Sequence, residues 1–167
     1  MIVELGHFAL ILALMVALVQ ATLPMWGAER GDARLMALAG PAAGLQLALV
    51  AGAFAALTWA FVVSDFSLAV VVSNSHTAKP MLYKVSGVWG NHEGSLLLWV
   101  LILSVYGGAV ALCGGNLPPR LRARVLAVQA MIGAAFMAFL LLTSNPFWRL
   151  ALPPLDGQDL NPLLQDP

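Results

Sequence analysis

The chain has 167 residues, of which 60% are hydrophobic and only 10% are charged, and its formal net charge is zero. Soluble domains carry about 25% charged residues, so this composition excludes an ordinary soluble protein and indicates a membrane protein. Zero net charge also removes the electrostatic basis for binding nucleic acid, which we therefore exclude as a partner.

Four apolar stretches have a length near the roughly 20 residues that a helix needs to cross the hydrocarbon core of a bilayer. They cover about residues 4–24, 38–63, 95–114 and 125–144. A long outer loop, 64–94, separates the second stretch from the third, and an outer tail, 145–167, follows the fourth. We predict an all-α polytopic membrane protein in which residues 1–167 form a single transmembrane helical region of a larger protein.

The basic residues predict how these helices are oriented, because short loops rich in Lys and Arg stay in the cytoplasm. The two short loops, 24–37 and 115–124, hold five arginines between them. The much longer loop 64–94 holds only two lysines. The short loops are therefore predicted to be cytoplasmic, with the N-terminus, the long loop and the tail on the opposite side.

Glycines in the second and third helices are spaced for close helix packing. Gly40 and Gly44 are four residues apart, the spacing that lets two membrane helices approach each other. Gly107 and Gly108 are interpreted in the same way.

The long loop contains two segments with distinct patterns. Residues 68–72 are rich in β-branched side chains and are predicted to be locally extended. Residues 78–88 follow Thr77, a good N-cap, and are predicted to form a short interfacial helix that lies on the membrane surface. Lys84 would then reach toward lipid phosphates. A structured loop packed on the bundle is the alternative for this segment.

The segment 88–99 carries the most chemistry in the chain, because it places polar and aromatic side chains where the third helix meets water. Asn91 is expected to cap this helix, and Glu93 to lie in its first turn, where the helix dipole favours negative charge. His92 is either a ligand for a metal or heme iron or a hydrogen-bonded interfacial side chain. The candidate cofactor-binding residues are Trp89, Gly90, His92, Glu93, Gly94, Ser95 and Trp99.

Ionisable side chains elsewhere on the outer side give weaker signals. Glu4 and His7 are three residues apart on one helix face and are predicted to form a small polar contact. If they turned inward, they would be candidates for a proton or ligand path. His76, among polar loop residues, is predicted to be solvated. In the tail, Trp148 and Arg149 suit the headgroup region of a membrane.

Five segments, in order along nearly the whole chain, resemble one known family. They are WGAxRGDAR at 26–34, SNS at 73–75, WGxHEGSLLLW at 89–99, TSNPF at 143–147 and GxDLNPLLQDP at 157–167. Together they resemble the N-terminal portion of the cytochrome c maturation heme lyases, the CcmF family. The nitrite-reductase-associated heme lyases are similar.

The resemblance implies a protein of the bacterial inner membrane that takes part in heme delivery and in covalent attachment of heme to apocytochrome c. It implies heme b as cofactor, and a heme chaperone, thiol-handling maturation subunits, apocytochrome c, further helices and the lipid bilayer as partners. The N-terminus and the tail would face the periplasm. The family protein is several times longer, and its heme-binding histidines lie beyond the point that matches Pro167. We therefore assign no catalytic residue and no metal ligand here, and this part alone is not expected to be active.

The residues alone leave two other functions open, a segment of a transporter for heme or a small molecule and a non-catalytic membrane scaffold. A transporter predicts a polar path through the bundle, whereas the predicted helix interiors are nearly free of ionisable groups. A scaffold predicts that Trp89, Glu93 and Trp99 can be replaced without loss of function. We prefer the heme lyase segment.

Overall fold

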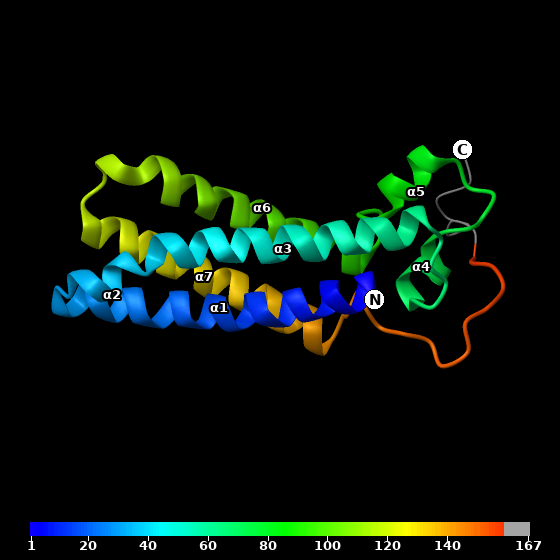
Figure 1. Ribbon diagram of the computed structural model, residues 1–167, viewed down its shortest axis with the longest axis horizontal. Helices are drawn as coiled ribbons and strands as arrows, with labels where there is room; N and C mark the ends of the chain where they lie inside the picture. Colours follow the sequence, from blue (N-terminus) through cyan, green and yellow to red (C-terminus); the bar gives the residue numbers. More distant parts are fainter. Residues whose placement is uncertain (159–167) are drawn as a thin grey trace.

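The computed structural model describes residues 1–158 and shows four long helices that run side by side (Figure 1). These are α1 (Ile2–Arg30), α3 (Ala39–Val62), α6 (His92–Cys113) and α7 (Pro119–Leu142). Each is long and apolar enough to cross a membrane. The predicted all-α fold with four membrane helices is therefore confirmed. Residues 159–167, which include most of the last resemblance segment, lie outside the described residues.

Shorter elements connect the long helices. They are α2 (Ala33–Ala37), α4 (Ala69–Asn74), α5 (Met81–Gly87) and the 3-10 turn η1 (Gly114–Asn116). The N-terminus, α4 and α5 lie at one end of the bundle, and α2 and the α6–α7 connection lie at the other (Figure 1). We name these the α4–α5 end and the α2 end.

The long helices extend beyond the apolar stretches that predicted them. Helix α1 continues past Pro24 to Arg30, whose guanidinium lies 4.2 Å from the centre of the Trp26 ring. It ends at Gly31, which has a left-handed φ of 72° that favours glycine. Helix α7 begins at Pro119, since proline is tolerated in the first turn, where its missing N–H costs nothing. Polar and charged residues thus extend the helices beyond the hydrocarbon core.

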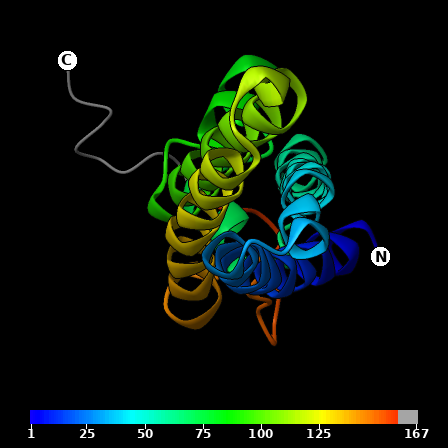
Figure 2. The ribbon, with the colours of Figure 1, turned by 90° about the vertical axis from the view of Figure 1, so that its left-hand side faces the viewer.

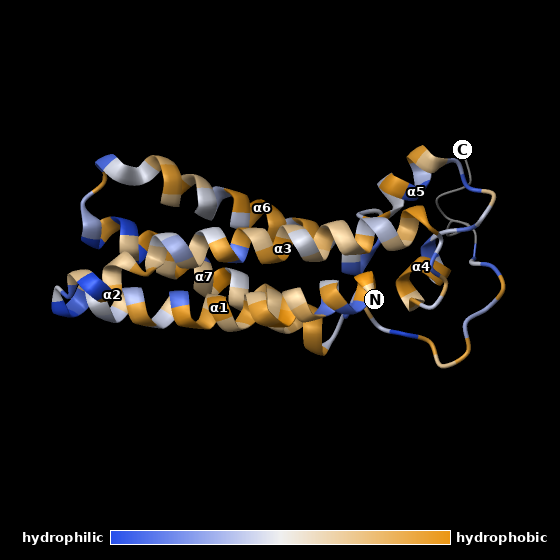
Figure 3. Ribbon diagram, in the orientation of Figure 1, coloured by the Kyte–Doolittle hydropathy of each residue, from blue (hydrophilic) through white to orange (hydrophobic). Residues whose placement is uncertain are grey.

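The four long helices enclose two buried hydrophobic clusters, a large one toward the α4–α5 end and a small one at the α2 end. Helices α1 and α6 both contact α3 and α7, as the view along the bundle shows (Figure 2). Each long helix contributes fully buried side chains, such as Leu10, Val50, Leu97 and Met137. Hydrophobic residues also cover much of the outer helix surfaces, whereas hydrophilic residues gather toward the two ends (Figure 3). This distribution is typical of a bundle surrounded by lipid.

Only part of the predicted glycine packing is present. A Cβ on Gly108 would lie 2.8 Å from the side chain of Leu47, so this glycine does bring α6 close to α3. A Cβ on Gly44 would meet nothing within 4 Å, so its predicted role in close packing is wrong. A Cβ on Gly107 would lie 2.8 Å from the amide of Gln129, so this glycine makes room for a polar side chain.

Two predictions for the long loop are wrong. The segment 68–72 was expected to be extended, yet α4 is helical because buried Val70 and Val71 pack into the core and override the β-branched preference. Helix α5 lies within the predicted 78–88, but the ammonium of Lys84 donates to Ser64 Oγ at 2.7 Å. This lysine is buried and does not reach toward lipid phosphates.

Candidate functional site

Asn91 joins α5 to α6 at the α4–α5 end. Its Oδ1 accepts a hydrogen bond of 2.7 Å from the Gly94 amide, which confirms the predicted N-cap. Its Nδ2 donates to the carbonyl oxygens of Gly87 at 2.8 Å and Val88 at 3.1 Å. One side chain therefore satisfies groups at the end of α5 and at the start of α6.

Gly94 allows this junction to close. A Cβ at this position would lie far inside the van der Waals radius of the Val88 carbonyl oxygen, and 2.8 Å from the carbonyl carbon. Only a glycine permits the backbone to approach this closely. Gly90, in the same motif, has only ordinary contacts, the nearest being 3.5 Å from Ser86 O.

The other candidate residues point in different directions. The indoles of Trp89 and Trp99 are exposed on the outside of the bundle, with Trp99 exposed to 63%. The exposed His92 contacts the edge of Phe139, with ring centroids 6.3 Å apart. Ser95 Oγ donates to the His92 carbonyl at 3.0 Å. The structure does not bring the seven candidates together, and cofactor binding by them stays a prediction.

Glu93 instead lines a polar pocket of about 240 Å³ at the α4–α5 end. The walls come from α4, from the first turn of α6 and from the segment that follows α7. The lining residues are Ala69, Val70, Ser73, Asn74, Glu93, Thr143, Ser144, Asn145 and Trp148. Three of the five resemblance segments, at 73–75, 89–99 and 143–147, thus contribute to a single pocket.

The pocket offers hydrogen-bond acceptors and a negative charge. Among the residues that the structure describes, Glu93 has no hydrogen bond and no ion pair, and it lies in the first turn of α6. Ser144 is only 8% exposed, and no hydrogen bond of its hydroxyl is found within residues 1–158. Trp148 is 65% exposed and adds an aromatic wall. These groups fit a cation or a hydrogen-bond donor.

The tail closes the pocket by pairing with the start of α4. The amide of Ala69 donates to Trp148 O at 3.0 Å, and that of Leu150 donates to Ser67 O at 2.9 Å. Arg149 forms an ion pair with Glu4 of α1 and donates to Ser67 Oγ at 3.0 Å. The tail thereby links α1, α4 and α7.

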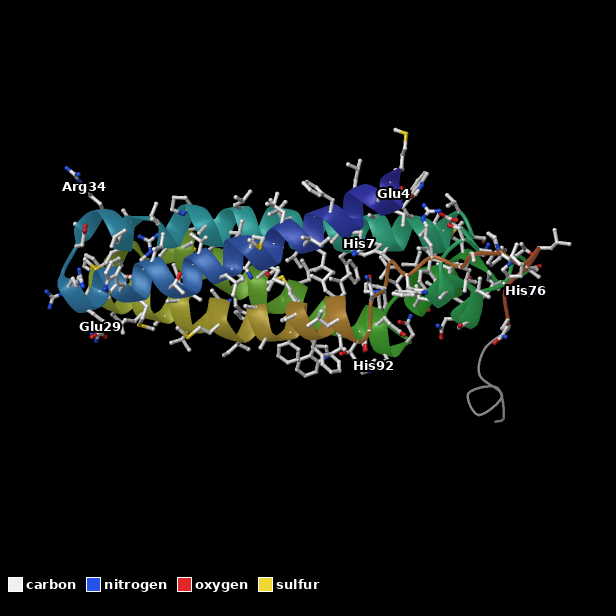
Figure 4. All side chains as sticks on the ribbon, turned by 90° about the horizontal axis from the view of Figure 1, so that it is seen from below. Glu4, His7, Glu29, Arg34, His76 and His92 are labelled. Atoms are coloured by element: carbon white, nitrogen blue, oxygen red, sulfur yellow. The ribbon has the colours of Figure 1, made fainter. Side chains whose placement is uncertain are left out.

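The histidines occupy three separate places. His7 contacts Asn145 Nδ2 at 3.2 Å and stacks on Phe147, while Glu4 pairs with the tail, so the predicted Glu4–His7 contact is wrong. His76, predicted to be solvated, is partly exposed and lies 3.3 Å from an Asp156 carboxylate oxygen. Figure 4 shows His92 on the opposite side of the bundle from Glu4. Within residues 1–158, no three His, Cys, Asp or Glu side chains gather as a metal site.

Asp156 fastens the tail to the long loop. Its carboxylate accepts hydrogen bonds from the Thr77 hydroxyl at 2.5 Å and from the Thr77 amide at 3.0 Å. Thr77 therefore binds the tail instead of capping α5, whose N-cap is Pro80. The hydroxyl of Thr77, more than any other group, holds the pKa of Asp156 below its ordinary value of 3.8.

This contact should weaken in acid. Because the pKa of Asp156 is lower in the folded protein than in the unfolded chain, its stabilising effect is present above the ordinary pKa and is lost as the pH falls through the folded pKa. We expect the exchange protection factor of the Thr77 amide to drop below about pH 4. In Asp156→Asn it should be low and independent of pH. A protection factor that stays constant in acid for the wild type would contradict this.

Glu93 is the one pocket residue that the sequence motif at 89–99 predicted as a candidate, and the pocket itself was not predicted. Asn74, Thr143 and Ser144 lie in segments that carried the family resemblance, so that signal was present. Trp148 was predicted only as a membrane anchor. The sequence did not predict that the tail folds back onto the start of α4, because this depends on the pairing of Leu68 with Arg149, which are far apart in the chain.

Comparisons with known proteins agree with this structure. The family model described as cytochrome C assembly protein matches residues 89–167. The chain is 68% identical over its whole length to cytochrome c-type biogenesis protein ccl1 of Rhodobacter capsulatus, covering 26% of that protein. It is 60% identical to CcmF of Pseudomonas aeruginosa and 35% identical to NrfE of Haemophilus influenzae, over 99% of the chain and 25% and 26% of those proteins.

A solved structure shows the same fold. The protein described as cytochrome c heme lyase CcmF matches with a TM-score of 0.83 at 31% identity, over 88% of this chain and 25% of that one. The chain thus spans about a quarter of the length of the relatives it matches. It belongs to the CcmF family of cytochrome c-type biogenesis membrane proteins, as an N-terminal segment.

Proposed function

We propose that this chain is the N-terminal membrane segment of a heme lyase in cytochrome c maturation, and that its pocket at the α4–α5 end receives a polypeptide partner. The observation that carries the proposal is the convergence of three family-like segments on one pocket around Glu93. If these segments served only to stabilise the fold, their polar side chains would form hydrogen bonds with one another. The Glu93 carboxylate, however, has no hydrogen bond or ion pair with residues 1–158.

The pocket chemistry favours a basic side chain of that polypeptide. A carboxylate, an aromatic face at Trp148 and the hydroxyl of Ser144 together suit the ammonium of lysine or the guanidinium of arginine. Apocytochrome c and the thiol-handling maturation subunits are the partners that this function implies. The same acidic pocket would repel the carboxylates of heme.

Heme b does not fit the pocket around Glu93. The three histidines lie apart, and the 240 Å³ pocket is below the range of about 300–1,000 Å³ of ordinary cofactor sites. We therefore place the heme ligands, and the contacts to a heme chaperone, on further helices of the protein. The candidate motif 89–99 would then position the polypeptide near heme held elsewhere.

The location that follows is the bacterial inner membrane, with the α4–α5 end in the periplasm. The five arginines of the short loops lie at the α2 end, where Figure 4 labels Arg34, and short loops rich in arginine stay in the cytoplasm. The N-terminus and the tail would then be periplasmic, on the side where cytochrome c receives heme.

Glu93→Gln in the full-length protein tests the proposal, because it removes the charge and keeps the shape. We expect normal protein level, a several-fold loss of holocytochrome c and less apocytochrome recovered with the lyase. The matched control is Glu29→Gln, which alters an exposed carboxylate 3.4 Å from Arg124 at the α2 end and should leave maturation normal. Full maturation by the Glu93 variant would show that the pocket has no such function.

Two alternatives make different predictions. A scaffold predicts that Glu93→Gln and Trp89→Ala both mature cytochrome c normally. A transporter requires a continuous polar path, but the polar cavity inside the bundle has a volume of only about 10 Å³. This observation favours the heme lyase segment over the transporter.

A further inference from the structure

A small polar cavity lies inside the bundle, about two to three helical turns from the α2 end. Each long helix contributes one polar side chain to its wall: Gln20 from α1, Gln46 from α3, Ser104 from α6 and Gln129 from α7. Four polar side chains at one level of an otherwise apolar bundle are costly unless their hydrogen bonds are satisfied.

The side-chain oxygen of one of these residues has no hydrogen-bond donor within the described part of the chain. Gln20 is only 2% exposed, and its Nε2 donates to Leu126 O at 3.0 Å. Its Oε1 is completely buried and accepts no hydrogen bond from residues 1–158. An unsatisfied buried acceptor costs about 1–3 kcal/mol, so a partner for this oxygen is expected.

The neighbouring polar groups are suitably placed to share such a partner. Gln129 Nε2 donates to Leu103 O, and Ser104 Oγ donates to Val100 O at 2.9 Å, so both side chains keep an oxygen lone pair for a further bond. The amide of Gln46 lies beside Gly133, where a Cβ would come within 3.2 Å of its Nε2. Glycines at 107 and 133 thus leave space for glutamine side chains around the cavity.

The size of the cavity selects the partner. Its volume of about 10 Å³ leaves room for a single water molecule, and a buried water needs two to four polar partners. We propose that this cavity binds one water molecule, which donates to Gln20 Oε1 and bonds polar groups of the other three helices. The site is independent of the pocket around Glu93 and of the function proposed for it.

X-ray hydroxyl-radical footprinting of the full-length protein in lipid nanodiscs tests the proposal, with H₂¹⁸O as the probe. Radicals formed from a bound water oxidise only the side chains beside it. We expect oxidation of Leu103, which lines the cavity, and loss of this oxidation to background in Gln20→Met. Gln158→Met, which makes the same chemical change on an exposed tail residue, should leave it unchanged.

Two results would overturn the proposal. The first is an unmodified Leu103 in the wild type while the exposed Met81 is oxidised, which would show a dry cluster. The second is equal oxidation of Leu103 in Gln20→Met, which would show that the water is not held by Gln20. If that variant does not fold, Gln46→Met replaces it, because the same loss of oxidation is expected.

Discussion

Gly94→Ala is expected to disrupt the junction of α5 and α6 and to destabilise the protein by about 3 kcal/mol. The added methyl group would overlap the Val88 carbonyl oxygen, which belongs to the backbone and cannot rotate away. Relief requires that the first turn of α6 moves, which breaks the Asn91 cap and displaces Glu93 from the pocket. We expect a lower midpoint of thermal unfolding in detergent and loss of cytochrome c maturation.

Two alanine variants serve as controls for Gly94→Ala. Gly90→Ala lies in the same motif, but its Cβ would meet only ordinary contacts beginning at 3.5 Å, so stability should change little. Gly44→Ala places a methyl group in open space within α3, where alanine favours the helix by up to about 1 kcal/mol. Equal stability of Gly94→Ala and Gly90→Ala would contradict the close approach at Val88.

The membrane helices were predictable because a single property decides them. A run of about 20 apolar residues has one stable solution in a bilayer, a helix with all its backbone hydrogen bonds inside. Their ends were less predictable, because polar residues extend them. The tip of α1 shows this, since Arg30 folds back over Trp26 well past the apolar stretch.

The outer elements were harder to predict because long-range contacts decide them. Helix α4 forms from a β-branched segment since Val70 and Val71 are buried in the bundle. Lys84 turns inward because Ser64, twenty residues earlier, accepts its hydrogen bond. Neither contact has a local sequence signal. Asn91 was predictable, since a cap acts within three residues of its own position.

Of the pocket at the α4–α5 end, only Glu93 was predicted as a candidate residue, and the polar cavity inside the bundle was not predicted. Glu93 stands in a dense motif, whereas the pocket around it depends on the tail returning to α4. Gln20 and Gln46 are uncharged residues within apolar runs, so the sequence pattern of ionisable groups does not indicate them. Uncharged amides in a membrane helix carry the same cost of burial and point to the same kind of internal site.

Phe147 anchors the tail that closes the pocket. Its side chain is 3% exposed and stacks on His7, with ring centroids 5.9 Å apart. A Cβ on Gly6 would lie 2.9 Å from the Phe147 ring, so the absence of a side chain at Gly6 lets this ring pack closely against the backbone of α1. The Phe147 amide donates to Asn145 Oδ1 at 2.9 Å, which fixes the turn that leads out of α7.

Phe147→Ala is therefore expected to cost about 3 kcal/mol, the lower end of the range for a buried phenylalanine. The larger consequence is local, because the cavity beside Gly6 and His7 removes the main apolar contact between the tail and α1. We expect a lower unfolding midpoint, together with faster hydrogen exchange at the Ala69 amide, which donates to Trp148 O.

Trp148→Ala is the matched control, since it truncates the adjacent but exposed aromatic side chain. It should keep stability within about 0.5 kcal/mol and impair only cytochrome c maturation, through the pocket wall. If both variants unfold at the same temperature, Phe147 is not the anchor, and the Arg149–Glu4 ion pair would have to hold the tail instead.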